Sequence, residues 1–121
     1  MRQLGQLEAA VMQRLWSWNR PASVREVLED LVQERTLAYT TVMTVMDNLH
    51  SKGLVRREKQ GRAYLYAASS TREEHTAALL GQVLADSTDR SATLLRFVET
   101  LNPGEVAELR AALRERPEEP S

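Results

Sequence analysis

Residues 38–68, AYTTVMTVMDNLHSKGLVRREKQGRAYLYAA, decide the fold of this 121-residue chain. The first part of the stretch places apolar side chains at the spacing of a helix with one buried face: Val42, Val45, Met46 and Leu49. Gly53 follows where such a helix would end. Residues 54–59 and 63–67 then have strand character, and a two-residue link at Gln60-Gly61 suits a tight hairpin. The stretch therefore predicts a helix followed directly by a β-hairpin, as in a winged helix.

The other face of the predicted helix is polar and is lined with threonine. It comprises Thr40, Thr41, Met43, Thr44, Asp47, Asn48 and Ser51. Threonine can hydrogen-bond base edges or place its methyl group against thymine, and base-reading residues are expected in the first turns of a recognition helix. The alternatives are an ordinary exposed polar face, or capping of the helix by Thr40 or Thr36. We favour DNA contact, because a hairpin rich in cations follows this helix.

The cations of the hairpin are closely spaced. Lys52, Arg56, Arg57, Lys59 and Arg62 fall within eleven positions and are opposed only by Glu58. Charged side chains also protect a hairpin edge from aggregation, so a solvated edge is the alternative interpretation. Their position after a polar helix favours contacts to phosphate. The predicted DNA-binding residues are Tyr39, Thr40, Thr41, Met43, Thr44, Asn48, Lys52, Arg56, Arg57, Lys59 and Arg62.

Charge is distributed unevenly along the chain, although the formal net charge is only −1. Residues 1–70 contain ten Lys and Arg against seven Asp and Glu, a balance of +3. Residues 71–121 contain six against ten, a balance of −4. The near-neutral total argues against indiscriminate nucleic-acid binding, whereas the basic first half is compatible with a localised DNA-binding surface.

Two further helices are predicted before the central stretch. Residues 4–18 form an apolar stripe in which both tryptophans, Trp16 and Trp18, are assigned to the core rather than to ligand stacking. Ser23 and Glu26 have the spacing of a capping box that opens the second helix, which is expected to end near Gln33. The predicted fold is mainly α with a small two- to three-stranded antiparallel wing, formed by residues 1–70.

Residues 71–116 are predicted to form three short helices, starting near Thr71, Ser91 and Pro103. Their apolar stripes have no evident partner within the chain, and a homodimer would bury them. We assign to this helical dimerisation domain Leu80, Leu84, Leu94, Phe97, Val98, Leu101, Val106, Leu109 and Leu113. Residues 117–121 are expected to be a flexible tail.

The sequence offers little for catalysis. It has no cysteine, no glycine-rich phosphate loop and two histidines, His50 and His75, which we interpret as separate surface residues rather than metal ligands. We therefore expect no enzyme activity, no metal and no cofactor. There is no signal peptide and no run of roughly 20 apolar residues, so a cytoplasmic protein without membrane insertion is expected.

Six short segments together resemble the penicillinase-repressor family, the BlaI/MecI type of transcriptional repressor. They are Leu4-Gly5 to Leu7-Glu8, Val11-Met12, Leu15-Trp16, Val24-Arg25-Glu26-Val27, Ala38-Tyr39-Thr40-Thr41-Val42 and Lys52-Gly53-Leu54-Val55. The resemblance covers residues 4–113. It implies a homodimeric winged-helix repressor that binds a palindromic double-stranded DNA operator, with Thr40, Thr41, Met43 and Thr44 as reading positions.

The resemblance also implies a route of inactivation, because repressors of this type are cleaved through a sensor-linked protease. The corresponding bond here is Arg96-Phe97, where the family has asparagine before phenylalanine, so both the protease and the inducing signal remain open. Phe97 would serve as dimer core in either case. A winged-helix regulator that senses a small molecule, and a winged-helix module that binds only protein, are the alternative functions.

Overall fold

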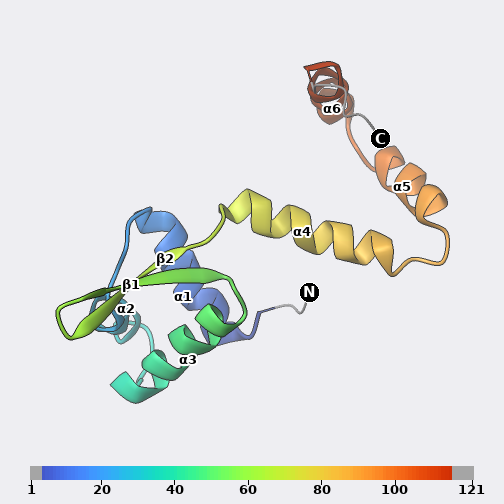
Figure 1. Ribbon diagram of the computed structural model, residues 1–121. Helices are drawn as coiled ribbons and strands as arrows, with labels where there is room; N and C mark the ends of the chain where they lie inside the picture. Colours follow the sequence, from blue (N-terminus) through green and yellow to red (C-terminus); the bar gives the residue numbers. More distant parts are fainter. Residues whose placement is uncertain (1–3, 116–121) are drawn as a thin grey trace. The chain divides into compact units, whose positions relative to one another are not determined.

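The computed structural model describes residues 4–115 and contains six helices and one two-stranded sheet within them (Figure 1). The helices are α1 (Gln6–Trp18), α2 (Val24–Leu31), α3 (Tyr39–Ser51), α4 (Arg72–Ala85), α5 (Arg90–Glu99) and α6 (Pro103–Glu115). The strands are β1 (Val55–Gln60) and β2 (Ala63–Ala68). This order confirms the predicted winged helix followed by three helices. The predicted tail, residues 117–121, lies outside the described residues.

Local sequence signals set the ends of the first helices. Ser23 Oγ accepts a hydrogen bond from the Glu26 backbone N–H at 3.1 Å, and Glu26 Oε1 accepts one from the Ser23 N–H at 3.1 Å. This confirms the capping box that opens α2. Helix α3 ends in a Schellman motif, in which Gly53 has φ +79° and the Leu54 N–H reaches the Leu49 carbonyl at 3.0 Å. The predicted stop at Gly53 is therefore confirmed.

The main core lies among α1, α2, α3 and the sheet. Its largest fully buried side chains are Val11, Met12, Leu15, Val27, Leu31, Val42, Met46, Leu49 and Tyr66. The helical stripes in the sequence supply all of these except Tyr66, which comes from β2. Helix α2 ends at Leu31, two residues before the predicted end near Gln33, so Val32 lies just after the helix and is 46% exposed.

The hairpin is antiparallel, with Gln60 paired to Ala63 and Val55 paired to Ala68. The two-residue turn is therefore Gly61-Arg62, and the predicted link at Gln60-Gly61 was wrong by one residue. Gly61 has φ +63°, which suits the first central position of a type II′ turn and places Arg62 at the tip. An isolated bridge between Ala22 and Tyr66 adds a minimal third strand, in keeping with the predicted two- to three-stranded wing.

The chain divides into two compact units, the first ending at Leu79 and the second beginning at Leu80. The start of α4 belongs to the first unit because Trp16 holds it: the indole Nε1 donates to the Ser70 carbonyl at 3.0 Å. His75 packs against the same ring at 5.4 Å between centroids and is only 7% exposed. The prediction of a surface histidine at position 75 was therefore wrong. The predicted domain boundary at residue 70 stays a prediction.

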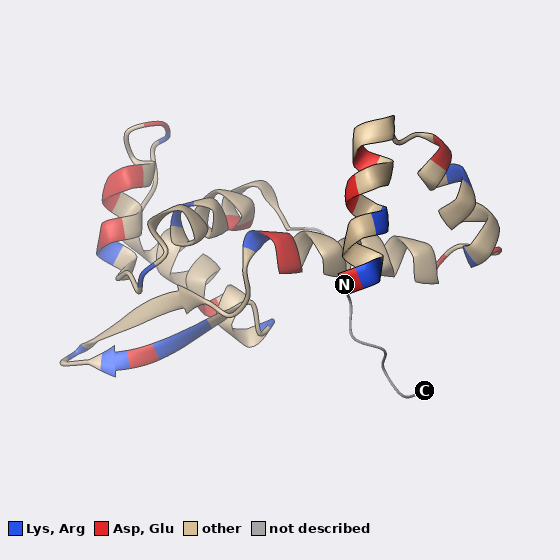
Figure 2. Cartoon of the chain, turned by 90° about the horizontal axis from the view of Figure 1, so that it is seen from above, with Lys and Arg blue, Asp and Glu red and all other residues tan. Residues whose placement is uncertain are grey.

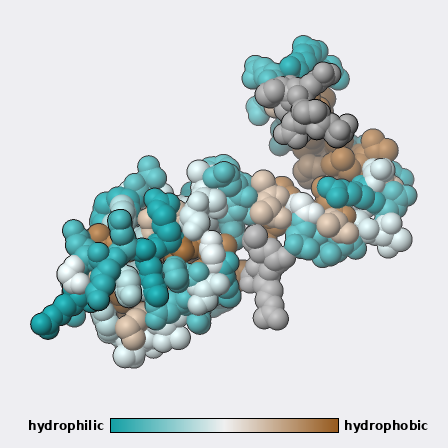
Figure 3. All heavy atoms as spheres, in the orientation of Figure 1, coloured by the Kyte–Doolittle hydropathy of each residue, from teal (hydrophilic) through white to brown (hydrophobic). Residues whose placement is uncertain are grey.

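The second unit consists of short, well-capped helices with little buried surface. Asp89 caps α5, which begins at Arg90 rather than at Ser91, and Asn102 exchanges two hydrogen bonds with Glu105 at the start of α6. Hydrophobic side chains appear on the visible surface of this part of the chain in Figure 3. Several are substantially exposed: Leu80, Val83, Leu94, Leu95, Phe97, Leu109 and Leu113. These include Leu80, which the sequence assigns to apolar stripes that lack a partner within the chain.

Candidate nucleic-acid interface

Helix α3 presents an exposed polar face on the side opposite its buried stripe. The predicted reading residues Tyr39, Thr40, Thr41, Met43, Thr44 and Asn48 are all exposed. Ala38 is the N-cap of α3, and no side chain caps the helix, so the capping alternative for Thr36 and Thr40 is wrong. The threonine side chains therefore remain available on the first two turns of the helix.

Asp47 departs from the prediction that it belongs to this exposed face. It is half-buried, and its Oδ1 accepts hydrogen bonds from Tyr66 Oη at 2.9 Å and Arg57 Nη1 at 3.0 Å. The cause is the position of Asp47 on the side of α3 that faces the hairpin. Burial, reinforced by the hydrogen bond to Asp47, raises the pKa of the Tyr66 phenol, so the hydroxyl stays protonated and remains a donor. Asp47 thus joins α3 to the wing.

The hairpin cations fall into two groups. Lys and Arg lie on both sides of a single acidic position along β1, as Figure 2 shows. Arg57 is ion-paired with Asp47 and stacks over Tyr64 at 4.3 Å, and Lys52 is paired with Glu8 at 2.7 Å. In contrast, Arg56, Lys59 and Arg62 are exposed and form no ion pair within residues 4–115. Arg56 donates to the Ala68 carbonyl at 3.0 Å, which holds it along the sheet.

The pair formed by Lys52 and Glu8 joins the C-terminal end of α3 to the first turn of α1. The hydrogen bond from Lys52 lowers the pKa of Glu8, opposed in part by burial, and the Gly5 N–H adds to the lowering. Lys52 therefore has a structural partner in addition to its predicted role at phosphate. A salt link of this kind fixes the end of α3 relative to the core.

Arg25 is an additional cation near the start of α3 that the sequence did not single out. Its guanidinium lies over the Tyr39 ring at 5.6 Å, and both side chains are exposed. Arginine on an aromatic face is a favourable arrangement that also orders the ring. The only sequence signal was an outward-facing arginine in the first turn of helix α2, which is too common to indicate function.

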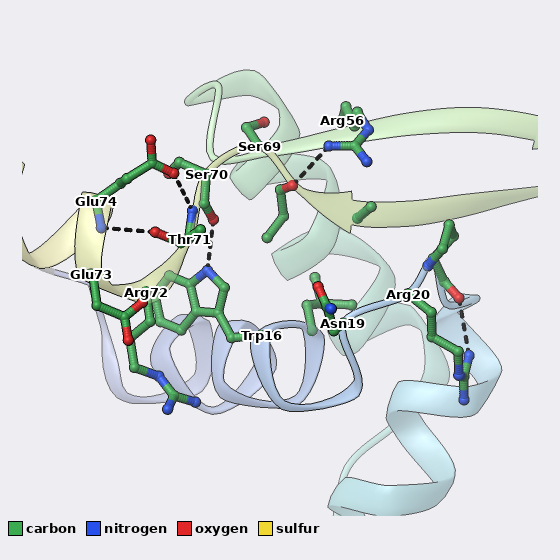
Figure 4. A pocket seen from close by; sticks show the side chains of 14 residues that line it. Trp16, Asn19, Arg20, Arg56, Ser69, Ser70, Thr71, Arg72, Glu73 and Glu74 are labelled. Atoms are coloured by element: carbon green, nitrogen blue, oxygen red, sulfur yellow. Dashed lines mark hydrogen bonds between the residues drawn. The ribbon is translucent and has the colours of Figure 1, made fainter.

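A pocket of about 510 Å³ lies near the junction of β2 and α4, within the first unit (Figure 4). Arg20, Arg56, Arg72 and Trp16 line it. Its polar groups are already engaged: Trp16 bonds the Ser70 carbonyl, and Arg20 pairs with Glu26. Thr71 and Glu74 exchange hydrogen bonds, which lower the pKa of Glu74. These groups therefore do not need a ligand to complete their hydrogen bonding.

Other kinds of site find no support in the described part of the chain. Residues 4–115 contain no cluster of three or more His, Asp or Glu side chains that could hold a metal ion. None of the helices described has the length and apolar character needed to span a bilayer. The surface formed by α3 and the hairpin is thus the main candidate functional site.

Comparison with known proteins points the same way. Residues 4–115 match the penicillinase repressor family. The chain is 47% identical over 115 residues to the transcriptional regulator BlaI of Mycobacterium tuberculosis, covering 93% of this chain and 83% of that protein. The same match is found for two strains of that organism.

Two solved structures with similar folds are of the same type. The DNA-binding domain of the repressor BlaI superposes with a TM-score of 0.51 at 25% identity, covering 60% of this chain and 87% of that one. Monomeric Bacillus licheniformis BlaI in complex with the blaP half-operator gives 0.50 at 25% identity, covering 60% and 88%. The family match over nearly all described residues settles the relationship: the chain belongs to the penicillinase repressor family.

Proposed function

We propose that this chain is a transcriptional repressor that binds a palindromic operator as a homodimer. The observation that supports it most is the juxtaposition of an exposed threonine face on α3 with unpaired cations on the adjoining hairpin. A helix of this kind fits the major groove, while Arg56, Lys59 and Arg62 would contact phosphates and fix its register. The similar structures of BlaI, one of them a complex with the blaP half-operator, support the same function. A repressor that binds DNA in this way would act in the cytoplasm.

Dimerisation through the second unit accounts for its exposed apolar side chains. Leu80, Leu94, Phe97 and Leu113 are each at least 46% exposed in the single chain, which is costly in water. An isologous interface between two copies would bury these side chains, together with Leu84, Val98, Leu101, Val106 and Leu109. Two winged helices would then be held at a fixed separation.

Selection of bound duplexes from a random DNA pool tests the proposal directly. We expect an inverted repeat, with half-site centres about 34 to 36 Å apart or a multiple of that. Recovery of a single asymmetric site bound by a monomer would contradict the proposal. If no duplex shows salt-dependent binding, a protein-binding module becomes the better assignment.

The reading and phosphate-binding roles can be separated by two substitutions. Thr44→Ala should lower discrimination between operator and random DNA by about 1 kcal/mol, with an unchanged salt dependence. Lys59→Ala should weaken binding to both DNAs and flatten the plot of log K against log salt by about 0.9. Fluorescence anisotropy titrations at several salt concentrations measure both effects. Equal behaviour of the two variants and the wild type would contradict these roles.

Relief of repression by proteolysis is the finer part of the proposal. The bond between Arg96 and Phe97 lies inside α5, and both side chains are exposed in the single chain. Helical backbone has to unwind before a protease can act, so α5 would have to open locally. Cleavage there would separate α6 from the rest of the chain and remove part of the proposed dimer interface. Mass spectrometry of the protein from induced cells should then show a fragment that ends at Arg96.

A further inference from the structure

Two side chains of the hairpin converge on one carboxylate oxygen of α3. Asp47 projects from α3, while Arg57 on β1 and Tyr66 on β2 donate to its Oδ1 at 3.0 and 2.9 Å. Arg57 and Tyr66 are directly paired across the two strands. Both donors therefore stand side by side on the same face of the hairpin, and one acceptor on the helix holds both strands.

The environment makes this contact rigid. Tyr66 is only 2% exposed, and Arg57 is sandwiched between Asp47 and the ring of Tyr64, which itself meets Tyr66 edge to face at 6.3 Å. These contacts hold the Arg57 and Tyr66 side chains in place, so that both donors point at Asp47. The arrangement determines where the hairpin lies relative to the helix.

The contact also removes a positive charge from the hairpin surface. The Arg57 side chain is 28% exposed and neutralised by Asp47, whereas Lys59 and Arg62 are exposed and form no ion pair in the described part of the chain. A guanidinium held in this way contributes less to phosphate binding than a free one. Arg57 thus differs from its neighbours, although sequence spacing gives all of them the same expected role.

We propose that Asp47, Arg57 and Tyr66 form a positioning unit that sets the hairpin against α3 and so determines operator specificity. The inference rests on the proposed function, and it assigns to Arg57 a positioning role in place of a phosphate contact. Base reading by α3 and phosphate binding by the hairpin require both elements to fit the duplex at once. The positioning unit ensures that they do so only in one register.

Substitution of Asp47 gives the clearest test. Asp47→Asn keeps an oxygen acceptor but releases the charge of Arg57, so affinity for random DNA should rise and its salt slope should steepen by about 0.9. Discrimination in favour of the selected operator should fall at least tenfold. Asp30→Asn is the matched control. Asp30 is also paired with an arginine, Arg14, at 2.8 Å, but this pair joins α1 to α2 and does not involve the hairpin. The control should leave both quantities as in the wild type.

Two more variants separate positioning from simple stability. Tyr66→Phe removes one donor and keeps the buried ring, so discrimination should fall several-fold while the salt slope stays unchanged. Arg57→Ala should lower discrimination with little change of slope, unlike Lys59→Ala, which should flatten it. All variants are compared well below their melting temperatures, where a purely structural role would leave the slope and the discrimination unaltered.

The outcomes are distinct. If Arg57→Ala flattens the slope as much as Lys59→Ala, Arg57 is a phosphate contact and the positioning role is overturned. Unchanged discrimination in Asp47→Asn and Tyr66→Phe would overturn it equally. A wild type that binds DNA without preferring any sequence would overturn the proposed repressor function itself, and with it the positioning unit.

Discussion

The two units of the chain differ in how far their apolar side chains are buried within the single chain. The first unit buries most of its large apolar side chains within itself, and Val11, Leu31, Val42, Met46 and Leu49 are all nearly inaccessible. In the second, Leu80, Leu94, Phe97, Leu109 and Leu113 remain exposed, and no residue of α5 or α6 is buried. The first unit therefore has a core of its own, whereas the second leaves apolar side chains exposed, as the proposed dimer would require.

The largest expected effect is on the core of the first unit. Leu31→Ala should lower its free energy of unfolding by about 2 to 5 kcal/mol, because Leu31 is fully buried and its loss leaves a cavity. Both tryptophans, Trp16 and Trp18, lie in this unit, so urea denaturation followed by tryptophan fluorescence reports on it specifically. The midpoint should not depend on protein concentration. A concentration-dependent midpoint would show that this unit too needs a partner.

A substitution in the second unit should act through association instead. Phe97→Ala should weaken the proposed dimer by about 2 kcal/mol or more, since large aromatic side chains dominate such interfaces. Sedimentation equilibrium of the variant and wild type gives the two dissociation constants. The tryptophan-detected unfolding of the first unit should be unchanged. A dimer of wild-type affinity would remove Phe97 from the interface.

The capping residues provide a smaller, matched comparison. Ser23→Ala and Asn102→Ala each remove a side-chain cap, which typically costs about 1 kcal/mol. Ser23→Ala should lower the tryptophan-detected stability, because α2 packs into the core. Asn102→Ala should instead reduce helicity in circular dichroism without moving the tryptophan transition. Identical effects of both variants on fluorescence would indicate that the two units unfold together.

Acid should destabilise mainly the first unit, where three glutamates have lowered pKa values. The hydrogen bond from Lys52 lowers that of Glu8, and backbone hydrogen bonds from Ser23 and Thr71 lower those of Glu26 and Glu74. A depressed folded-state pKa gives stability that is present above the unfolded value of about 4.3 and is lost as pH falls through the folded value. Tryptophan-detected melting should therefore decline below about pH 5. Glu26→Gln should make this decline shallower, and an unchanged pH profile would show that Glu26 contributes little.

The sequence by itself determined the order of the helices, the capping box at Ser23, the stop at Gly53 and the family. These features follow from local spacing, which needs no knowledge of distant contacts. The two-residue hairpin turn was placed one residue early, because Gly61 belongs to both candidate pairs, Gln60-Gly61 and Gly61-Arg62. Only strand register distinguishes them.

Tertiary structure alone decided which polar side chains are buried or paired and which remain exposed without a partner. His75 is buried because Trp16, distant in sequence, covers it, and Asp47 leaves the reading face because Arg57 and Tyr66 approach it from the hairpin. Lys52 likewise pairs with Glu8, which lies 44 positions earlier in the sequence. The sequence gives each of these side chains its chemistry, but its partner comes from another element. Only the fold therefore shows that Arg57 is ion-paired whereas Lys59 and Arg62 are not, within residues 4–115.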